Sequence, residues 1–222
     1  MGTDNLFHRK KVKSVKYLAR RKAKRRSYDK VLIVCEGEKT EPFYFKELRI
    51  HYDLASANIE VFGAKGTDPA SIFGFARRRF AAEKKKGDSY DRVYCVFDKD
   101  KHQNFLTTVE SIRIANPEGV YFAITSVPCF EFWLLLHFCY TTSPYHSVPG
   151  KSACDQVISD LERYLPGYEK GCRNLFSELF TQVEVAKKRA TKVCVQAREA
   201  QTENPSTRVH ELVEYLQNIK QK

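Results

Sequence analysis

The fold of this 222-residue chain follows from two stretches, VLIVCEGEKTEP at residues 31–42 and VYCVFDKD at residues 93–100. Each begins with an apolar run of strand length, rich in β-branched and aromatic residues, and each run stops abruptly at carboxylates. Parallel α/β sheets have their ligand sites just beyond the carboxyl ends of the strands. If these two strands are neighbours, Glu36, Asp98 and Asp100 converge on one point, where their oxygen atoms suit Mg²⁺ or Mn²⁺.

The segments around these two strands predict an α/β fold. Strand-length apolar runs alternate with helical patterns, the strands at 31–35, 59–62, 92–97 and 121–125 and the helices at 40–52, 69–86 and 105–115. Thr40 and Asp68 are expected to cap the first two helices, because a proline follows each in the first turn. Connections of this length allow parallel pairing. We therefore expect a four-stranded, mainly parallel sheet with helices on both faces.

The rest of the chain is predicted to be mostly helical. The most apolar helix candidate is CFEFWLLLHF at 129–138, and further helices are expected at 153–164, 175–200 and 207–220. The tripeptide Asn204-Pro-Ser206 is expected to break the chain and cap the last helix. These patterns divide the chain into a basic arm (1–27), a catalytic domain (28–140) and a helical C-terminal region packed on it (141–222).

The positive charge of the chain is concentrated in the N-terminal arm. Of the net charge of +11, residues 1–27 supply +10, with eleven Lys and Arg against Asp4, which leaves 27 basic and 26 acidic residues downstream. The arm is either a solvated segment or one that pairs with nucleic-acid phosphates or with an acidic protein. The basic residues expected to contact nucleic acid are Arg20, Arg21, Lys22, Lys24, Arg25 and Arg26.

Composition also bears on the compartment. The seven cysteines form no Cys-x-x-Cys pair, so their spacing indicates neither a disulfide framework nor a zinc site. The sequence shows no signal-peptide pattern and no run of apolar residues long enough to span a membrane. A protein of the reducing cytoplasm, with no membrane partner, is therefore expected.

An Asp-x-Asp sequence after a strand has three interpretations, which the residues alone leave open. Asp98 and Asp100 project to the same side of an extended chain and can bind one divalent metal. Asp98 can instead be the nucleophile of aspartyl-phosphate chemistry, or the pair is a solvated strand end. Glu36 favours the metal, because a buried strand does not need a carboxylate at its tip, and Gly37 after it permits close approach of the backbone.

Further charged residues lie near these strand ends or at the start of a helix. Glu38 is a candidate accessory acid, whereas Glu41 is interpreted as structural, because negative charge favours the first turn of a helix. Glu131 begins the most apolar helix, so it either faces solvent or is buried beside a partner such as a metal. Lys39 and Lys65 are candidate phosphate contacts.

These residues resemble a known family. A strand ending in Glu36-Gly37, followed at a distance by one ending in Asp-x-Asp, is similar to the Toprim (topoisomerase-primase) catalytic domain. More narrowly, EGEKTEP at 36–42, PCFEFWLLLHF at 128–138 and NPST at 204–207 resemble the RloB-like proteins. These are prokaryotic proteins of restriction-linked and abortive-infection phage-defence loci, often encoded beside a partner ATPase.

The resemblance implies a function and roles for individual residues. It makes Glu36 the general acid/base, Asp98 and Asp100 the Mg²⁺ ligands and Glu131 a further ligand, in a nuclease that cleaves DNA or RNA during phage defence. No tyrosine is singled out as a nucleophile, so DNA rejoining is not expected. Two alternatives stay open: a non-catalytic, metal-stabilised subunit that acts with the ATPase, and a phosphatase or phosphotransferase that uses Asp98.

Overall fold

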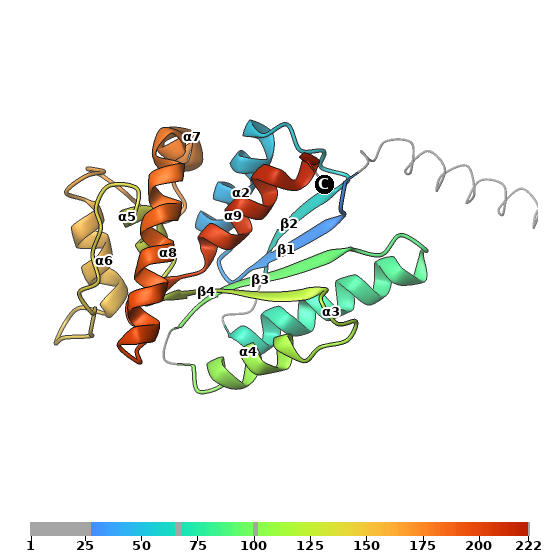
Figure 1. Ribbon diagram of the computed structural model, residues 1–222, viewed down its shortest axis with the longest axis horizontal. Coiled ribbons are helices and arrows are strands. Elements are labelled where there is room, and N and C mark those ends of the chain that lie inside the picture. Colours follow the sequence, from blue (N-terminus) through green and yellow to red (C-terminus); the bar gives the residue numbers. More distant parts are fainter. Residues whose placement is uncertain (1–27, 65–67, 100–101, 222) are drawn as a thin grey trace, which may run out of the picture.

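The computed structural model describes residues 28–64, 68–99 and 102–221, and its centre is a five-stranded sheet (Figure 1). The strands are β1 (Val31–Cys35), β2 (Ile59–Gly63), β3 (Arg92–Asp98), β4 (Tyr121–Val127) and β5 (Ser206–Thr207), in the order β2-β1-β3-β4-β5. The first four are parallel and β5 is antiparallel to β4. The predicted α/β class and the four parallel strands are confirmed, whereas the predicted strand number is one too few.

Helices cover both faces of the sheet, as its two-sided apolar strands require. On one face lie α3 (Pro69–Lys85) and α4 (Phe105–Arg113), and on the other lie α2 (Thr40–His51) and α9 (Val209–Asn218) (Figure 1). Alternate residues of β1 enter different cores: Leu32 and Val34 pack with α3, whereas Val31, Ile33 and Cys35 pack with α2 and the C-terminal helices.

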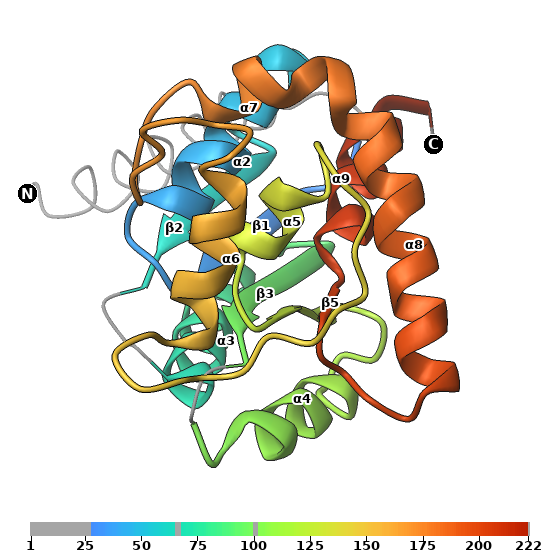
Figure 2. The same cartoon turned by 90° about the vertical axis from the view of Figure 1, so that its left-hand side faces the viewer.

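The C-terminal helices lie beyond the carboxyl ends of the strands, at the left of Figure 1 and facing the viewer in Figure 2. They are α5 (Glu131–Leu135), α6 (Ala153–Leu161), α7 (Leu175–Leu179) and α8 (Val183–Glu199), with a short 3₁₀ turn at Phe180–Gln182 between α7 and α8. A second 3₁₀ turn, Ile219–Gln221, follows α9. The single helix predicted over 175–200 is therefore wrong. The chain turns at Phe180–Gln182 because α7 packs on α2, whereas α8 packs on α5 and α9.

Two predicted helix caps also differ from the structure. Thr40 is the first residue of α2 rather than its cap, and its hydroxyl accepts a hydrogen bond from the Gly171 amide at 2.9 Å. The segment Asn204-Pro-Ser206 does not cap α9, because Ser206 and Thr207 pair with the end of β4. The predicted cap of α3 is confirmed, since Asp68 accepts hydrogen bonds from the amides of Ala70 and Ser71.

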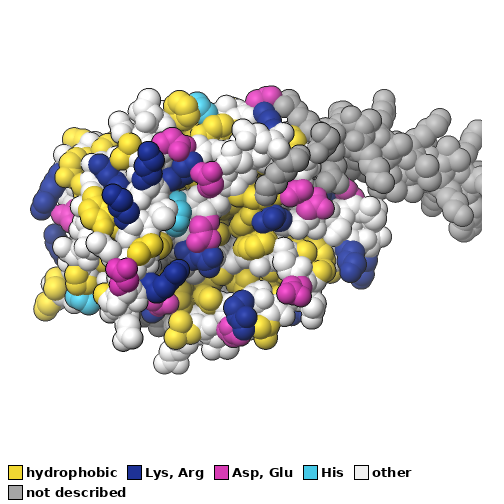
Figure 3. Space-filling view, in the orientation of Figure 1, with side chains coloured by type: hydrophobic (Ala, Val, Ile, Leu, Met, Phe, Trp, Pro, Cys, Tyr) yellow, Lys and Arg dark blue, Asp and Glu magenta, His cyan; other side chains and the backbone are white. Residues whose placement is uncertain are grey.

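Charged side chains of both signs are interspersed over the face drawn in Figure 3. This distribution agrees with the near-neutral charge of residues 28–222, which hold 27 basic and 26 acidic residues. Among the helices of the described ranges, none has the length and apolar character needed to cross a bilayer.

Candidate functional site

The strands that end in carboxylates are neighbours in the sheet, as expected. Cys35 of β1 lies opposite Val96 of β3, and the Glu36 amide donates to the Val96 carbonyl at 2.9 Å. The Asp98 amide in turn donates to Oε2 of Glu36 at 3.0 Å, and Nε2 of His102 lies 3.8 Å from Oε1 of Glu36. The ends of β1 and β3 thus bring Glu36 and Asp98 together and orient the Glu36 carboxylate.

Glu41 is a member of this site that the sequence did not reveal. It stands in the first turn of α2, where the sequence indicated a structural role, yet it is only 8% exposed and faces the other acids of the site. A Cβ atom on Gly37 would lie 2.4 Å from Oε2 of Glu41, so Gly37 leaves the space that this carboxylate fills. The one signal in the sequence was Gly37 itself, because a glycine after a strand-ending acid indicates that something approaches closely.

Glu131 is buried, which excludes the alternative that it faces solvent. The Tyr168 hydroxyl donates to its Oε1 at 3.1 Å, and the Cys154 thiol donates to its Oε2 at 3.4 Å. Nζ of Lys170 lies 3.6 Å from the same Oε1. Burial alone would lower the pKa of Lys170, but the Glu131 carboxylate together with Cys154 and Cys129 outweighs burial, so this pKa is raised. Glu131 is therefore held by residues of the C-terminal region.

The carboxylates of Glu36, Glu41, Asp98 and Glu131 influence one another's pKa values. Burial raises the pKa of Asp98 well above its usual value, and the charges of Glu41, Glu131 and Glu36 raise it further. Burial likewise raises the pKa of Glu41 to about 7, with Glu131 and Glu36 contributing in the same direction. Within the described ranges, no ion pair reaches Glu41 or Asp98. A cluster of buried carboxylates without ion pairs is stabilised by a bound cation, because the cation offsets the repulsion between their negative charges.

The four carboxylates line a pocket of about 910 Å³ between the end of the sheet and the C-terminal helices. Three lysines also line it: Lys39, Lys99 and Lys170. Lys99 forms an ion pair with Glu203, which lies in the segment before β5. The pocket thus combines hard acid ligands with cations at its edge, and both the sheet and the C-terminal region contribute to its walls.

The loop between β1 and α2 is fixed by a close backbone contact. A Cβ on Gly63, at the end of β2, would lie 2.7 Å from the Gly37 carbonyl oxygen and from Cα of Glu38. Only glycine allows this approach, which sets the path of the loop. Glu38, the candidate accessory acid, and Lys39, a candidate phosphate contact, both line the pocket and are exposed there.

Some predicted site residues lie outside the described residues, namely Asp100, Lys65 and the arm residues Arg20, Arg21, Lys22, Lys24, Arg25 and Arg26. Glu36, Glu41 and Asp98 fit a hard divalent cation by their oxygen chemistry. Their spacing is open rather than cage-like, because none of them belongs to a group of three ligand atoms lying within 4.8 Å of one another in the described part of the chain. This arrangement suits Mg²⁺, which keeps several waters and uses one or two carboxylates plus substrate phosphates.

Comparison with known families agrees with the motifs of the pocket. The model of the RloB-like protein family matches residues 31–216, from the first residue of β1 into α9. The chain belongs to the RloB-like family. The match covers the described carboxylates of the pocket and the C-terminal helices that close it. No curated protein and no solved structure gave a significant match.

Proposed function

We propose that this RloB-like protein is a Toprim-like, Mg²⁺-dependent nuclease that cleaves DNA or RNA phosphodiester bonds in the cytoplasm during phage defence. One observation carries the proposal: Glu36, Glu41, Asp98 and Glu131 converge beyond the carboxyl ends of parallel strands, in a pocket edged by lysines. This is the place where α/β sheets bind ligands. Oxygen ligands for a metal, together with nearby lysines, match a substrate that contains phosphate groups. The metal and the lysines would both neutralise the negative charge of those phosphates.

In this proposal Asp98, Asp100 and Glu41 hold the Mg²⁺, and Glu131 completes the negative charge of the site. The bound ion would supply neutralisation of the charge that develops on the phosphate and the leaving oxygen. Glu36 has its carboxylate oriented by the Asp98 amide and lies near His102, so it is placed to accept or deliver a proton.

The lysines would bind the substrate through its backbone. Lys39, Lys99 and Lys170 line the pocket, and Lys65 and the arm are proposed to extend the contact along the nucleic acid. Phosphate contacts of this kind position a strand without reading its sequence. A partner ATPase of the same locus is proposed to control access or activity.

Cleavage assays with matched variants test the nuclease. The full chain is incubated with plasmid, single-stranded DNA and transfer RNA, with Mg²⁺ or Mn²⁺ and with a chelator. Asp98→Asn and Glu36→Gln should each abolish cleavage while the melting temperature shows a folded protein. Glu118→Gln, an exposed carboxylate before β4, is the control and should cleave normally.

The outcomes separate the alternatives. Undiminished cleavage by Asp98→Asn and Glu36→Gln would remove the pocket from the reaction. Hydrolysis of a phosphate monoester with no cleavage of nucleic acid would favour a phosphatase with Asp98 as nucleophile. Absence of both activities, with and without the ATPase, would favour a non-catalytic subunit. Deletion of residues 1–27 should weaken nucleic-acid binding and reduce its salt dependence.

A further inference from the structure

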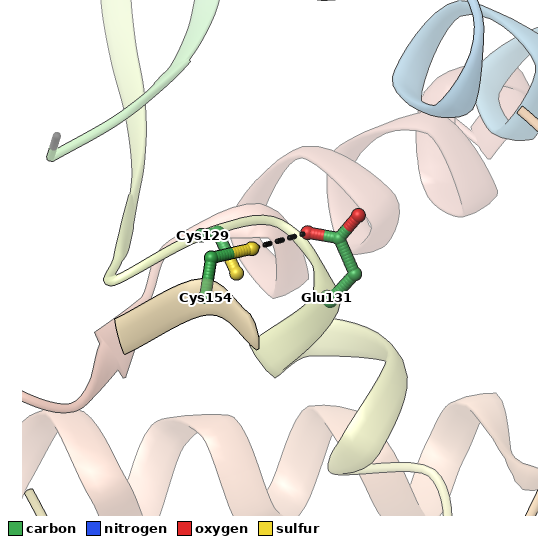
Figure 4. A group of neighbouring side chains, drawn as sticks. All are labelled: Cys129, Glu131 and Cys154. Atoms are coloured by element: carbon green, nitrogen blue, oxygen red, sulfur yellow. Dashed lines mark hydrogen bonds between the residues drawn. The ribbon is translucent and has the colours of Figure 1, made fainter. Parts of the chain in front are cut away.

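A second group of metal-binding side chains lies in the pocket wall formed by α5 and α6. Cys129 precedes α5, Glu131 is the first residue of α5, and Cys154 lies in the first turn of α6 (Figure 4). The two Sγ atoms and a carboxylate oxygen of Glu131 all lie within 4.8 Å of one another. Across the described ranges, this is the one group of three or more ligand atoms with such spacing.

The donor chemistry of this group differs from that of the acids at the ends of β1 and β3. Two cysteine sulfurs and one carboxylate suit Zn²⁺ rather than Mg²⁺. A tetrahedral Zn²⁺ holds sulfur at ~2.3 Å and oxygen at ~2.1 Å, which places the two ligand atoms about 3.6 Å apart. Sγ of Cys154 and Oε2 of Glu131 are 3.4 Å apart, so little adjustment is needed. We infer that Cys129, Glu131 and Cys154 form a Zn²⁺ site.

The surroundings of Glu131 are those of a metal ligand. The Tyr168 hydroxyl donates to Oε1 of Glu131. The other oxygen, Oε2, is directed at the Cys154 thiol (Figure 4). Outer hydrogen bonds of this kind orient metal-binding carboxylates in proteins. All three ligands line the pocket, so a Zn²⁺ that they hold would border it, and water or a substrate atom from the pocket would supply the fourth ligand.

Lys170 carries the positive charge that a bound Zn²⁺ would replace. Its Nζ lies 3.4 Å from Sγ of Cys154 and 3.6 Å from Oε1 of Glu131. The side chain is 57% exposed, so it can swing into solvent and make room for the ion. Lys170 therefore competes with the metal, and its removal should tighten zinc binding by about tenfold.

Metal binding by the reduced, metal-stripped full-length protein tests this site. Zn²⁺ uptake is measured by competition with a chromophoric chelator, and Co²⁺ serves as a spectroscopic probe, because cysteine coordination gives a sulfur-to-cobalt charge-transfer band. The wild type should bind one Zn²⁺, and its Co²⁺ form should show this band. Cys129→Ser and Cys154→Ser should each lose the band, and Lys170→Gln should bind more tightly. Glu131→Gln, which preserves the shape of the side chain, should weaken binding at least tenfold.

Two controls separate this site from the carboxylates at the ends of β1 and β3. Cys139→Ser changes a partly buried cysteine outside the pocket and should keep the band. Asp98→Asn should also keep it, so the zinc site stands whether or not the protein is a nuclease. Failure of the wild type to take up Zn²⁺ overturns the inference. A Co²⁺ band that persists in both Cys129→Ser and Cys154→Ser also overturns it. The same holds if Zn²⁺ binding is lost in Asp98→Asn and the Co²⁺ form of the wild type shows no band.

Discussion

Both ends of the central sheet hold buried carboxylates, but the negative charge of these carboxylates is neutralised by the protein's own cations to different extents. At the amino ends of the strands, the fully buried Lys30 ammonium lies 2.8 Å from Glu83 and 2.9 Å from Asp88. Burial opposes ionisation there, yet hydrogen bonds from Lys30 and Lys86 outweigh it and lower the pKa of Glu83 to about 2. This cluster carries its own cation and is complete without a ligand.

At the carboxyl ends of the strands the balance is reversed. Burial raises the pKa of Asp98 and brings that of Glu41 to about 7, and repulsion between the carboxylates adds to both shifts. Glu131 is paired with the half-exposed Lys170, but Asp98 and Glu41 form no ion pair in the part of the chain that the structure describes. The comparison shows that burial of acids is not itself a sign of function. What indicates a ligand site is a group of buried acids that repel one another, because a bound cation stabilises such a group.

The largest expected effect comes from breaking the balanced cluster. Lys30→Met should lower the free energy of unfolding by about 3–5 kcal/mol, because Glu83 and Asp88 are left buried without their cation. Urea denaturation measures the change. Lys85→Met, an exposed lysine of α3, is the matched control and should change stability by less than about 0.5 kcal/mol. An equally small loss of stability in Lys30→Met would contradict the conclusion that Lys30 neutralises Glu83 and Asp88.

The opposite sign is expected for a carboxylate of the pocket. Glu41→Gln should stabilise the metal-free protein at pH 8 by up to about 3 kcal/mol, since a shift from 4.5 to about 7 costs 1.36 kcal/mol per unit. Because the folded pKa is raised, the wild type loses stability as pH rises from 4.5 through about 7. The gain should therefore disappear below pH 4.5. Denaturation at several pH values measures it, and a gain independent of pH would refute this account.

Metal addition should act on one end of the sheet only. Mg²⁺ at 100 times its dissociation constant should stabilise the wild type by about 2.7 kcal/mol. Lys30→Met should gain the same amount from Mg²⁺, although it starts from lower stability, because its cluster lies at the other end of the strands. Asp98→Asn should gain little. Thermal melts across a Mg²⁺ titration give these differences, and equal shifts in all three proteins would show that the ion binds elsewhere.

The smallest effect on stability is expected from Gly37→Ala. The added Cβ would meet Oε2 of Glu41 at 2.4 Å, and the end of this flexible side chain can move aside at a cost below about 1 kcal/mol. The Mg²⁺-dependent stabilisation should nevertheless fall, because the carboxylate is displaced. Gly74→Ala in α3, where the nearest atom is 3.5 Å from the added Cβ, is the control. An unchanged Mg²⁺ response in Gly37→Ala would remove Glu41 from the metal site.

Local sequence determined the framework of this protein. The apolar runs of β1 and β3 are long enough to identify buried strands, and their abrupt ends place Glu36 and Asp98 at one edge of a parallel sheet. One of the motifs that resemble the RloB-like family, EGEKTEP at 36–42, directly follows β1, and the family match confirms that membership. These features could be predicted because strand periodicity and strand ends are properties of neighbouring residues.

Only the tertiary structure decided the rest of the pocket. Cys129 and Cys154 stand 25 positions apart along the chain and meet because α6 packs on α5, which no cysteine spacing could indicate. Ser206 and Thr207 become β5 because the end of β4 offers a free edge, not because of their own strand propensity. Glu41 carries the charge preferred by a first helical turn, and its burial depends on the space beside Gly37 and on the C-terminal helices. Local pattern thus fixed which acids end the strands, whereas long-range packing determined which other side chains face them.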